Sequence, residues 1–435
     1  MLLVLFLLVF TPYIAVLGTA VPVGYVAYAV AAFLFLTRGR ISKESASNDL
    51  LLITCLTFSV YCVSIFLLHM LTSGQADLRL LRLAVDPIIL ILTARYVIVR
   101  LSLPSGALDA YRLVWLLTAL LAVNSASIYL SFFFDGFRSV FYQIVVVNPK
   151  LFEYPIPRYG GFLYDGFSYS STLMAMISIV CHSIYSRYGL RRRSLAILLV
   201  HLASIPSAML AGRAGFLMLL AYFGVYTLLN LRVAIASLMR SPRSAFTGAL
   251  LIMLSIGLVN WIYVADSRLS EVFRHSVKIY TDFVESGAFF DYTAQELTEH
   301  HYFIPNSAYA LLFGEGYLFN WPAGMTRPDP GVTLGIFGFG VLGLSLLYLV
   351  MASPVLASIA AWRNANGARL RLAPSPMAHA VAFAASFIAL TFKDAYVFYP
   401  YPHFLLFFVF YYTVIGGAAG HRWLLTVPQG AAAPV

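Results

Sequence analysis

Charge is scarce in this sequence, and cysteine is scarcer. Only 11% of the 435 residues are charged and 3 are cysteine, whereas a soluble globular domain is about 25% charged. Cys55, Cys62 and Cys181 all lie inside apolar runs without a CxxC pattern, so we expect buried free thiols rather than disulfides or metal ligands. The sequence also lacks a GxxxxGK[ST] phosphate loop, which disfavours ATP-driven transport by this chain alone.

Apolar residues are abundant instead, at 61% of the chain with a mean hydropathy of +0.84. A helix that crosses a bilayer needs about 20 such residues in succession. About twelve runs qualify, and they cover residues 2–17, 20–37, 50–72, 78–98, 112–131, 168–186, 194–211, 214–230, 245–264, 332–352, 377–393 and 403–419. The pattern predicts an all-α polytopic membrane protein with one transmembrane domain over residues 1–435. No basic segment precedes the first run, so we interpret it as a span rather than a cleaved signal peptide.

The basic residues indicate the orientation. Most Lys and Arg, such as the cluster Arg191–Arg193, fall in alternate connections, which places those connections and both termini in the cytoplasm. The net charge of +10 is then mainly a topology signal and does not indicate nucleic-acid binding. Two long segments are expected on the outer side, residues 132–167 and 265–331. The second lies between spans nine and ten, and we expect short helices within it at 267–286 and 293–301.

Three short motifs give the sequence a specific resemblance. They are "AMLAGRAGFLMLL" at residues 208–220, "LLFGEG" at 311–316 and the glycine-rich "GIFGFGVLG" at 335–343. Together with the topology, they resemble the Wzy-type polysaccharide polymerases, which belong to the same superfamily as the O-antigen ligases. The ligases carry a His at the start of the helix after the large outer loop. This sequence has Asp329 there, in "RPDPGV", which favours the polymerase.

The resemblance implies a membrane glycosyltransferase of the bacterial inner membrane whose active site faces the periplasm. Its substrate would be a polyprenyl-diphosphate, such as undecaprenyl diphosphate, that carries an oligosaccharide repeat unit. The enzyme would join repeat units into a surface polysaccharide or exopolysaccharide without a metal or other cofactor. A flippase and a chain-length regulator would be its partners, along with the lipid bilayer.

Such a reaction needs cations to bind the diphosphate and a base to accept a proton. Arginine suits the first task because its planar guanidinium binds two phosphate oxygens at once. Arg213, between Gly212 and Gly215 at an expected outer helix junction, is the first candidate; the alternative is an arginine that reaches the lipid headgroups. The predicted catalytic residues are Arg213, Arg327 and Asp329, with Asp329 as the base. Further predicted substrate-binding residues are Arg158, Asp165, His300, His301 and Lys393.

Alternatives remain for several of these residues. His300, His301 and Glu299 are rivals for the role of base, and Asp165 serves equally well as a helix cap. Arg79, Arg82 and Asp86 share one helix face, and we expect them to form a buried structural ion network.

Two other functions compete with the polymerase. One is a ligase that transfers a finished chain to another acceptor. The other is a transporter or lipid-linked oligosaccharide flippase with twelve spans. A transporter of that size is typically built from similar halves or contains a pair of broken helices. The sequence shows neither, and its large outer segment occurs only in the second half.

Overall fold

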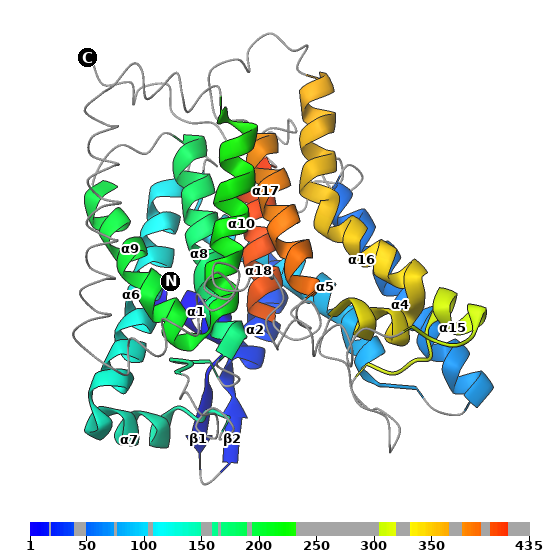
Figure 1. Cartoon of the computed structure of the whole chain (residues 1–435), viewed down its shortest axis with the longest axis horizontal. Coiled ribbons are helices and arrows are strands. Elements are labelled where there is room, and N and C mark those ends of the chain that lie inside the picture. Colours follow the sequence, from blue (N-terminus) through cyan, green and yellow to red (C-terminus); the bar gives the residue numbers. More distant parts are fainter. Residues whose placement is uncertain are drawn as a thin grey trace, which may run out of the picture.

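The computed structural model is mostly helical (Figure 1). It describes residues 1–16, 19–38, 49–73, 76–102, 108–148, 159–163, 167–188, 194–231, 304–318, 331–364, 376–392 and 401–415. The helices of the first half are α1 (Leu2–Phe10), α2 (Val23–Arg38), α4 (Leu50–Ser73), α5 (Arg79–Arg100), α6 (Ala110–Phe133), α7 (Asp135–Ile144), α8 (Phe167–Tyr188), α9 (Ser194–Ala211) and α10 (Arg213–Leu229). Then follow α15 (Ala308–Phe313), α16 (Gly331–Asn364), α17 (Pro376–Thr391), α18 (Tyr401–Phe410) and a π-helical turn, η3 (Tyr411–Ile415). Two strands, β1 (Tyr13–Val16) and β2 (Thr19–Pro22), form an antiparallel hairpin.

The described helices include several that suit a lipid bilayer. Three are long and apolar enough to cross a membrane by themselves: Leu50–Thr72, Ala110–Phe133 and Gly331–Ala360. Shorter apolar helices accompany them at Val23–Thr37, Leu195–Ala211, Ala214–Leu229, Pro376–Thr391 and Pro402–Ile415. The chain is therefore a helical, membrane-embedded protein. The expected span at 245–264 lies outside the described residues, and the total of twelve spans stays a prediction, as does the cytoplasmic placement of the termini.

The first apolar run does not form the span expected over residues 2–17. Helix α1 ends at Phe10, and Thr11 has a left-handed φ of 40°. Nine helical residues are about 14 Å long, about half of a hydrocarbon core. Pro12 lacks the N–H that a continuing helix needs, and the β-branched and aromatic residues after it form β1. Residues 13–16 and 19–22 therefore depart from the expected all-helical pattern, because β1 and β2 form a hairpin there.

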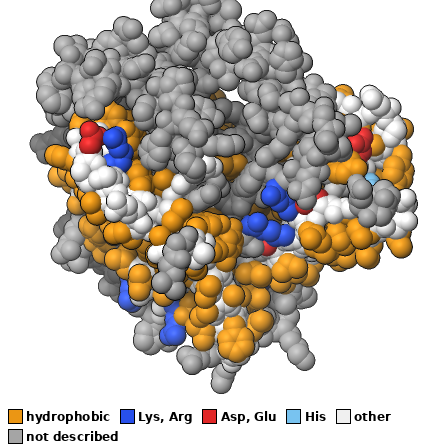
Figure 2. Space-filling view, turned by 90° about the horizontal axis from the view of Figure 1, so that it is seen from below, with side chains coloured by type: hydrophobic (Ala, Val, Ile, Leu, Met, Phe, Trp, Pro, Cys, Tyr) orange, Lys and Arg blue, Asp and Glu red, His pale blue; other side chains and the backbone are white. Residues whose placement is uncertain are grey.

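One end of the helical bundle carries the non-spanning elements. Figure 1 shows the β1–β2 hairpin, α7, α15 and the junction of α9 with α10 at its lower end, which we call the hairpin end. Helix α7 belongs to the segment 132–167 and α15 to the segment 265–331. The described parts of the two segments expected on the outer side therefore lie at the same end. Seen from there, the described surface is mostly hydrophobic, with Lys and Arg side chains in small separate groups (Figure 2).

Helix α16 is broken near its first third. Gly340 has φ 72° and ψ 178°, so two helices meet there. A residue other than glycine rarely adopts this left-handed φ. The sequence, read as an uninterrupted apolar run over 332–352, did not reveal this break.

Helix α18 forms the centre of the bundle. Figure 1 shows it enclosed by neighbouring helices, and nearly all its described side chains are buried. Phe407 and Phe410 both pack against Phe383 of α17, with ring centroids 5.7 and 4.7 Å apart. A helix that is apolar on all faces is typical of such a central position.

Candidate functional site

The first turns of α8 carry three successive hydroxyl residues, Ser170, Ser171 and Thr172, all of them fully buried. Successive residues of an α-helix point about 100° apart, so the three side chains face three different neighbours. Each hydroxyl is bonded to a different segment of the chain. We call these residues the hydroxyl triplet.

Ser170 holds the turn Tyr159–Leu163. Its hydroxyl donates to the carbonyl of Gly160 over 2.9 Å. On the other side of the turn, the N–H of Phe162 donates to Asn124 Oδ1 of α6 over 3.2 Å. Gly161 has φ +63°, and a Cβ there would overlap the Asn124 amide, so only glycine fits this close approach. The turn is thus attached to both α6 and α8.

Ser171 holds the junction between α9 and α10. Its hydroxyl donates to the carbonyl of Gly212 and accepts from the N–H of Gly215 over 2.9 Å. A Cβ on Gly215 would overlap the backbone of Ser171, so α10 and α8 touch through their main chains. Arg213 is the first residue of α10, so its backbone lies within this tightly packed junction.

Thr172 contacts the start of α18. Its hydroxyl lies 2.8 Å from His403 Nε2, and both side chains are fully buried. The direction of this hydrogen bond depends on the tautomer of the imidazole. The hydroxyl triplet thus joins three segments that lie far apart in the sequence.

An arginine of α7 completes this region. Arg138 Nη1 donates to the Tyr159 hydroxyl over 3.2 Å, and Nη2 lies 2.7 Å from Asp135 Oδ1. Tyr159 is buried, whereas Arg138 keeps a third of its side chain exposed. Arg138 was given no role from the sequence, because nothing in its spacing shows that it meets the turn that follows Arg158.

The motifs "LLFGEG" and "GIFGFGVLG" pack directly against each other. The N–H of Glu315 donates to the carbonyl of Phe337 over 2.6 Å, and the backbone of Leu312 lies where a Cβ of Gly340 would be. Tyr61 of α4 donates its hydroxyl to the carbonyl of Phe339 over 2.8 Å. The turn after α15 therefore packs against α16 at the break near Gly340. Partial burial raises the pKa of the Glu315 carboxyl above its ordinary value.

Most of the predicted site residues lie outside the described part of the chain. For Arg213 the structure describes the backbone and not the side chain. The other predicted residues lie outside the described part of the chain: Arg158, Asp165, Glu299, His300, His301, Arg327, Asp329 and Lys393. Both helices expected within 265–303 also lie outside it. Their roles stay predictions.

The expected ion network on α5 differs from its prediction. Arg82 and Asp86 do form an ion pair at 3.2 Å, but 41% of the Arg82 side chain is exposed. Arg82 also donates to the hydroxyl of Tyr25 over 3.2 Å. The pair is therefore partly exposed beside Tyr25 of α2 rather than buried.

A buried ion pair occurs elsewhere, where the sequence did not suggest one. Arg95 of α5 pairs with Asp49, and both side chains are almost fully buried. Tyr412 of η3 donates its hydroxyl to Asp49 Oδ2 over 2.7 Å and accepts from Arg95 Nε over 3.2 Å. From the sequence, Arg95 was assigned no role of its own. Its partners lie 46 and 317 residues away.

A second buried polar cluster surrounds Tyr222 of α10. Its hydroxyl lies 2.7 Å from His379 Nδ1, 3.2 Å from His182 Nδ1 and 3.0 Å from Ser183 Oγ. One phenol hydroxyl donates a single proton, so at least one of the two imidazoles must donate to it. The ring of Tyr226 stacks on His379 at 4.5 Å. Ionisable residues inside a membrane bundle are rare and commonly mark a functional site.

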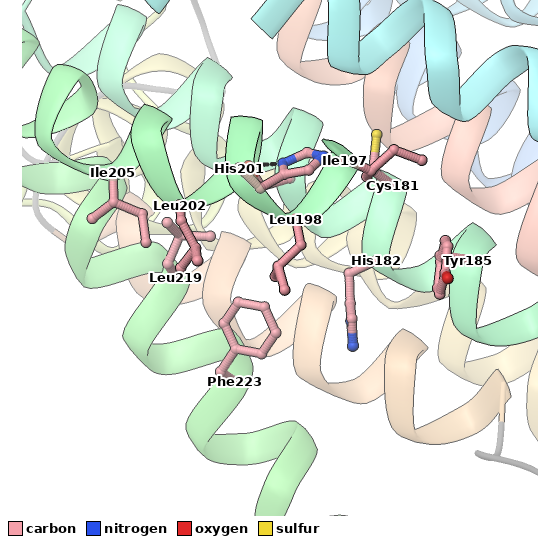
Figure 3. A pocket seen from close by; sticks show the side chains of 11 residues that line it. Cys181, His182, Tyr185, Ile197, Leu198, His201, Leu202, Ile205, Leu219 and Phe223 are labelled. Atoms are coloured by element: carbon pink, nitrogen blue, oxygen red, sulfur yellow. Dashed lines mark hydrogen bonds between the residues drawn. The ribbon is translucent and has the colours of Figure 1, made fainter. Parts of the chain in front are cut away.

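An apolar cavity of about 360 Å³ adjoins this cluster, between α8, α9 and α10 (Figure 3). His182 and His201 are on its wall among mostly apolar side chains. His201 Nδ1 lies 2.9 Å from Ser178 Oγ and Nε2 3.3 Å from Thr118 Oγ1. Both nitrogens of His201 are therefore engaged within the protein.

Neither a metal site nor a known family emerges from these residues. Among the described residues, no group of three or more His, Cys, Asp or Glu side chains is placed to hold a metal ion. The three cysteines are free and buried, as predicted. No family model matches the chain, and no curated protein is significantly similar to it in sequence.

Proposed function

We propose that this chain is a repeat-unit polymerase of the bacterial inner membrane. It would transfer a growing oligosaccharide from one polyprenyl-diphosphate to the next lipid-linked repeat unit, on the outer face of the membrane. The proposal starts from the resemblance to Wzy-type polymerases. A flippase that delivers the repeat units and a chain-length regulator would act with it.

The observation that carries the proposal is the convergence at the hydroxyl triplet. Ser170 binds the turn that directly follows Arg158, and Ser171 binds the junction from which Arg213 begins. Ser170 and Ser171 are consecutive residues, so their Cα atoms are about 3.8 Å apart. The segments that carry Arg158 and Arg213 are therefore attached to neighbouring residues of one helix. These two arginines are far apart in the sequence, and only the tertiary structure joins their segments.

The reaction gives these cations a task. The hydroxyl oxygen of the acceptor sugar attacks C1 of the donor sugar and forms a new glycosidic bond. The bond between C1 and the diphosphate oxygen breaks, and the lipid diphosphate leaves with the electron pair. Asp329 accepts the hydroxyl proton. Negative charge grows on the leaving diphosphate, so guanidinium groups fixed in advance stabilise the transition state.

Rigidity of the junction supports Arg213 as one of these groups. Catalysis by charge requires that the charge be held in place before the reaction begins. The backbone of Gly215 touches that of Ser171, and Gly212 is hydrogen bonded to the same serine. This junction is attached to α8 more tightly than an exposed loop would be.

The proposal is tested with purified protein in liposomes and a synthetic polyprenyl-diphosphate repeat unit, with a chelator present. A ladder of longer lipid-linked products is expected. Arg213→Ala should slow elongation by about 10²-fold to 10³-fold, the usual effect of losing one preorganised donor to a developing anion. Arg100→Ala is the matched control, since it removes an exposed arginine at the last residue of α5. Elongation by Arg213→Ala at the rate of the unmodified protein would remove Arg213 from the mechanism.

Two other results would change the functional class. A single product on a different acceptor, without a ladder, identifies a ligase. Transport without covalent transfer identifies a transporter or flippase. The cavity beside His182 and the break at Gly340 favour the transporter over the ligase as the second candidate. Transporters commonly place ionisable residues and broken helices inside the bundle.

A further inference from the structure

Helix α7 has one apolar face and one polar face. Phe137, Val140, Phe141 and Ile144 follow the spacing i, i+3, i+4 and i+7, which places them on one stripe. The opposite face is polar and carries Asp135, Arg138 and Ser139. No residue of α7 is buried. The helix therefore has an apolar stripe that the rest of the described protein does not enclose.

The two edges of this stripe differ in their surroundings. Phe141 packs against Phe162 at 5.1 Å and stacks on Phe137 at 5.3 Å, so the inner edge rests on the protein. Val140 and Ile144 on the other edge are 57% and 59% exposed. These are large exposures for aliphatic side chains on a structured helix.

The polar face is attached to the candidate site. Arg138 pairs with Asp135 and donates to the hydroxyl of Tyr159. The chain after α7 joins the hairpin, where the N–H of Val146 donates to the carbonyl of Tyr13 over 2.9 Å. The orientation of the stripe is therefore fixed by contacts on the opposite face and at the end of the helix.

The position of α7 matches the boundary of a bilayer. It begins two residues after α6 ends at Phe133, and α6 has 24 residues, or about 36 Å of helix, against a hydrocarbon core of about 30 Å. The end of α6 thus falls at the headgroup level. In Figure 1, α7 runs across the direction of the bundle helices, so it lies in the plane of the membrane if they cross it.

Exposed apolar residues also occur at the end of α6, next to α7. Phe133 and Phe134, at the corner between the two helices, are 47% and 58% exposed. Leu130, one turn earlier on α6, is 39% exposed. An amphipathic helix at this depth buries its apolar face about 5–10 Å into the boundary between headgroups and acyl chains.

We propose that α7 is an interfacial membrane helix, which inserts Val140 and Ile144 into the leaflet at the hairpin end and holds the Tyr159 turn through Arg138. Its partner is the lipid bilayer. This binding does not depend on the proposed polymerase reaction, because the apolar stripe and its attachments exist without substrate.

Spin labels test the insertion directly. Val140→Cys and Ser139→Cys place a nitroxide on the exposed edge of the stripe and on the adjacent polar face, in vesicles of phosphatidylethanolamine and phosphatidylglycerol. Leu199→Cys, at an exposed apolar position of α9, is the reference within the bilayer. The three native cysteines are buried, so the unmodified protein serves as the labelling blank. Collision rates with oxygen and with a neutral nickel chelate are then measured.

The expected result is a ratio of oxygen to nickel collisions at Val140 that is several-fold higher than at Ser139 and shifted towards Leu199. Equal ratios at Val140 and Ser139, with free access of nickel to both, would place α7 in water and overturn the proposal. A label at Val140 protected from both reagents would indicate a protein partner, such as a second copy, and would overturn it as well.

Discussion

Removing one member of the buried pair Asp49–Arg95 should destabilise the protein strongly. Asp49→Asn preserves the shape of the side chain and removes its charge. Arg95 then loses the charge of Asp49 and keeps the Tyr412 hydroxyl and the newly introduced amide group as neutral neighbours. Breaking a buried ion pair in this way costs about 3–5 kcal/mol. The side chains of Asp49 and Arg95 are 3% and 4% exposed, so solvent screens this loss very little.

The tyrosine has a smaller predicted effect. Tyr412→Phe removes one hydroxyl that donates to Asp49 and accepts from Arg95, while the ion pair between Asp49 and Arg95 remains. Loss of a buried hydrogen-bond partner costs about 1–3 kcal/mol. We therefore expect Tyr412→Phe to be less destabilising than Asp49→Asn.

The double variant Asp49→Leu/Arg95→Met gives the sharpest test. It removes both charges together and replaces them with apolar side chains, and such replacements are often neutral or stabilising. Stability is measured as the midpoint of SDS-induced or thermal unfolding in detergent micelles, with each single variant alongside the double. The reasoning is refuted if Asp49→Asn unfolds like the unmodified protein, or if the double variant loses as much stability as the two single variants added together.

Three further predictions follow from the packing. Gly215→Ala should destabilise by about 1–3 kcal/mol because the new Cβ overlaps the backbone of α8; its control on the same helix, Gly224→Ala, meets nothing within 4 Å and should unfold at the same point or later. Gly340→Ala should detach the turn after α15 from α16, seen as faster proteolysis of that turn, since the position has φ 72° and no space for a Cβ; unchanged proteolysis would contradict this. Tyr222→Phe should cost about 1–3 kcal/mol by leaving two imidazoles without their shared partner, and unfolding midpoints that match the unmodified protein would show that water replaces the hydroxyl.

Sequence patterns predicted most of the described helices because a spanning helix needs only a long apolar run. That rule depends on composition within about 20 residues, so it can be applied without knowledge of the fold. It failed at residues 11–22, where Pro12 and the β-branched residues after it produce a hairpin inside an apolar stretch. It failed again at Gly340, because an apolar run with several glycines looks the same whether the helix is continuous or broken.

The candidate site was predictable only in part. The motif around Arg213 indicated a helix junction, and α9 and α10 do meet there. The role of Ser171 in fixing that junction had no signal, since a serine in an apolar run most commonly bonds to the backbone of its own helix. Arg138 was equally hidden, because its contact with Tyr159 depends on how the chain returns from α7.

The sequence by itself determined that this is a helical membrane protein with little charge and buried cysteines. These properties follow from local composition, which acts through the hydrophobic effect and does not depend on which helices are neighbours. The tertiary structure decided which polar groups meet. Asp49, Arg95 and Tyr412 form one cluster although 363 residues separate the first from the last. Buried polar groups need partners, and only the packing of the helices determines which partners lie within reach.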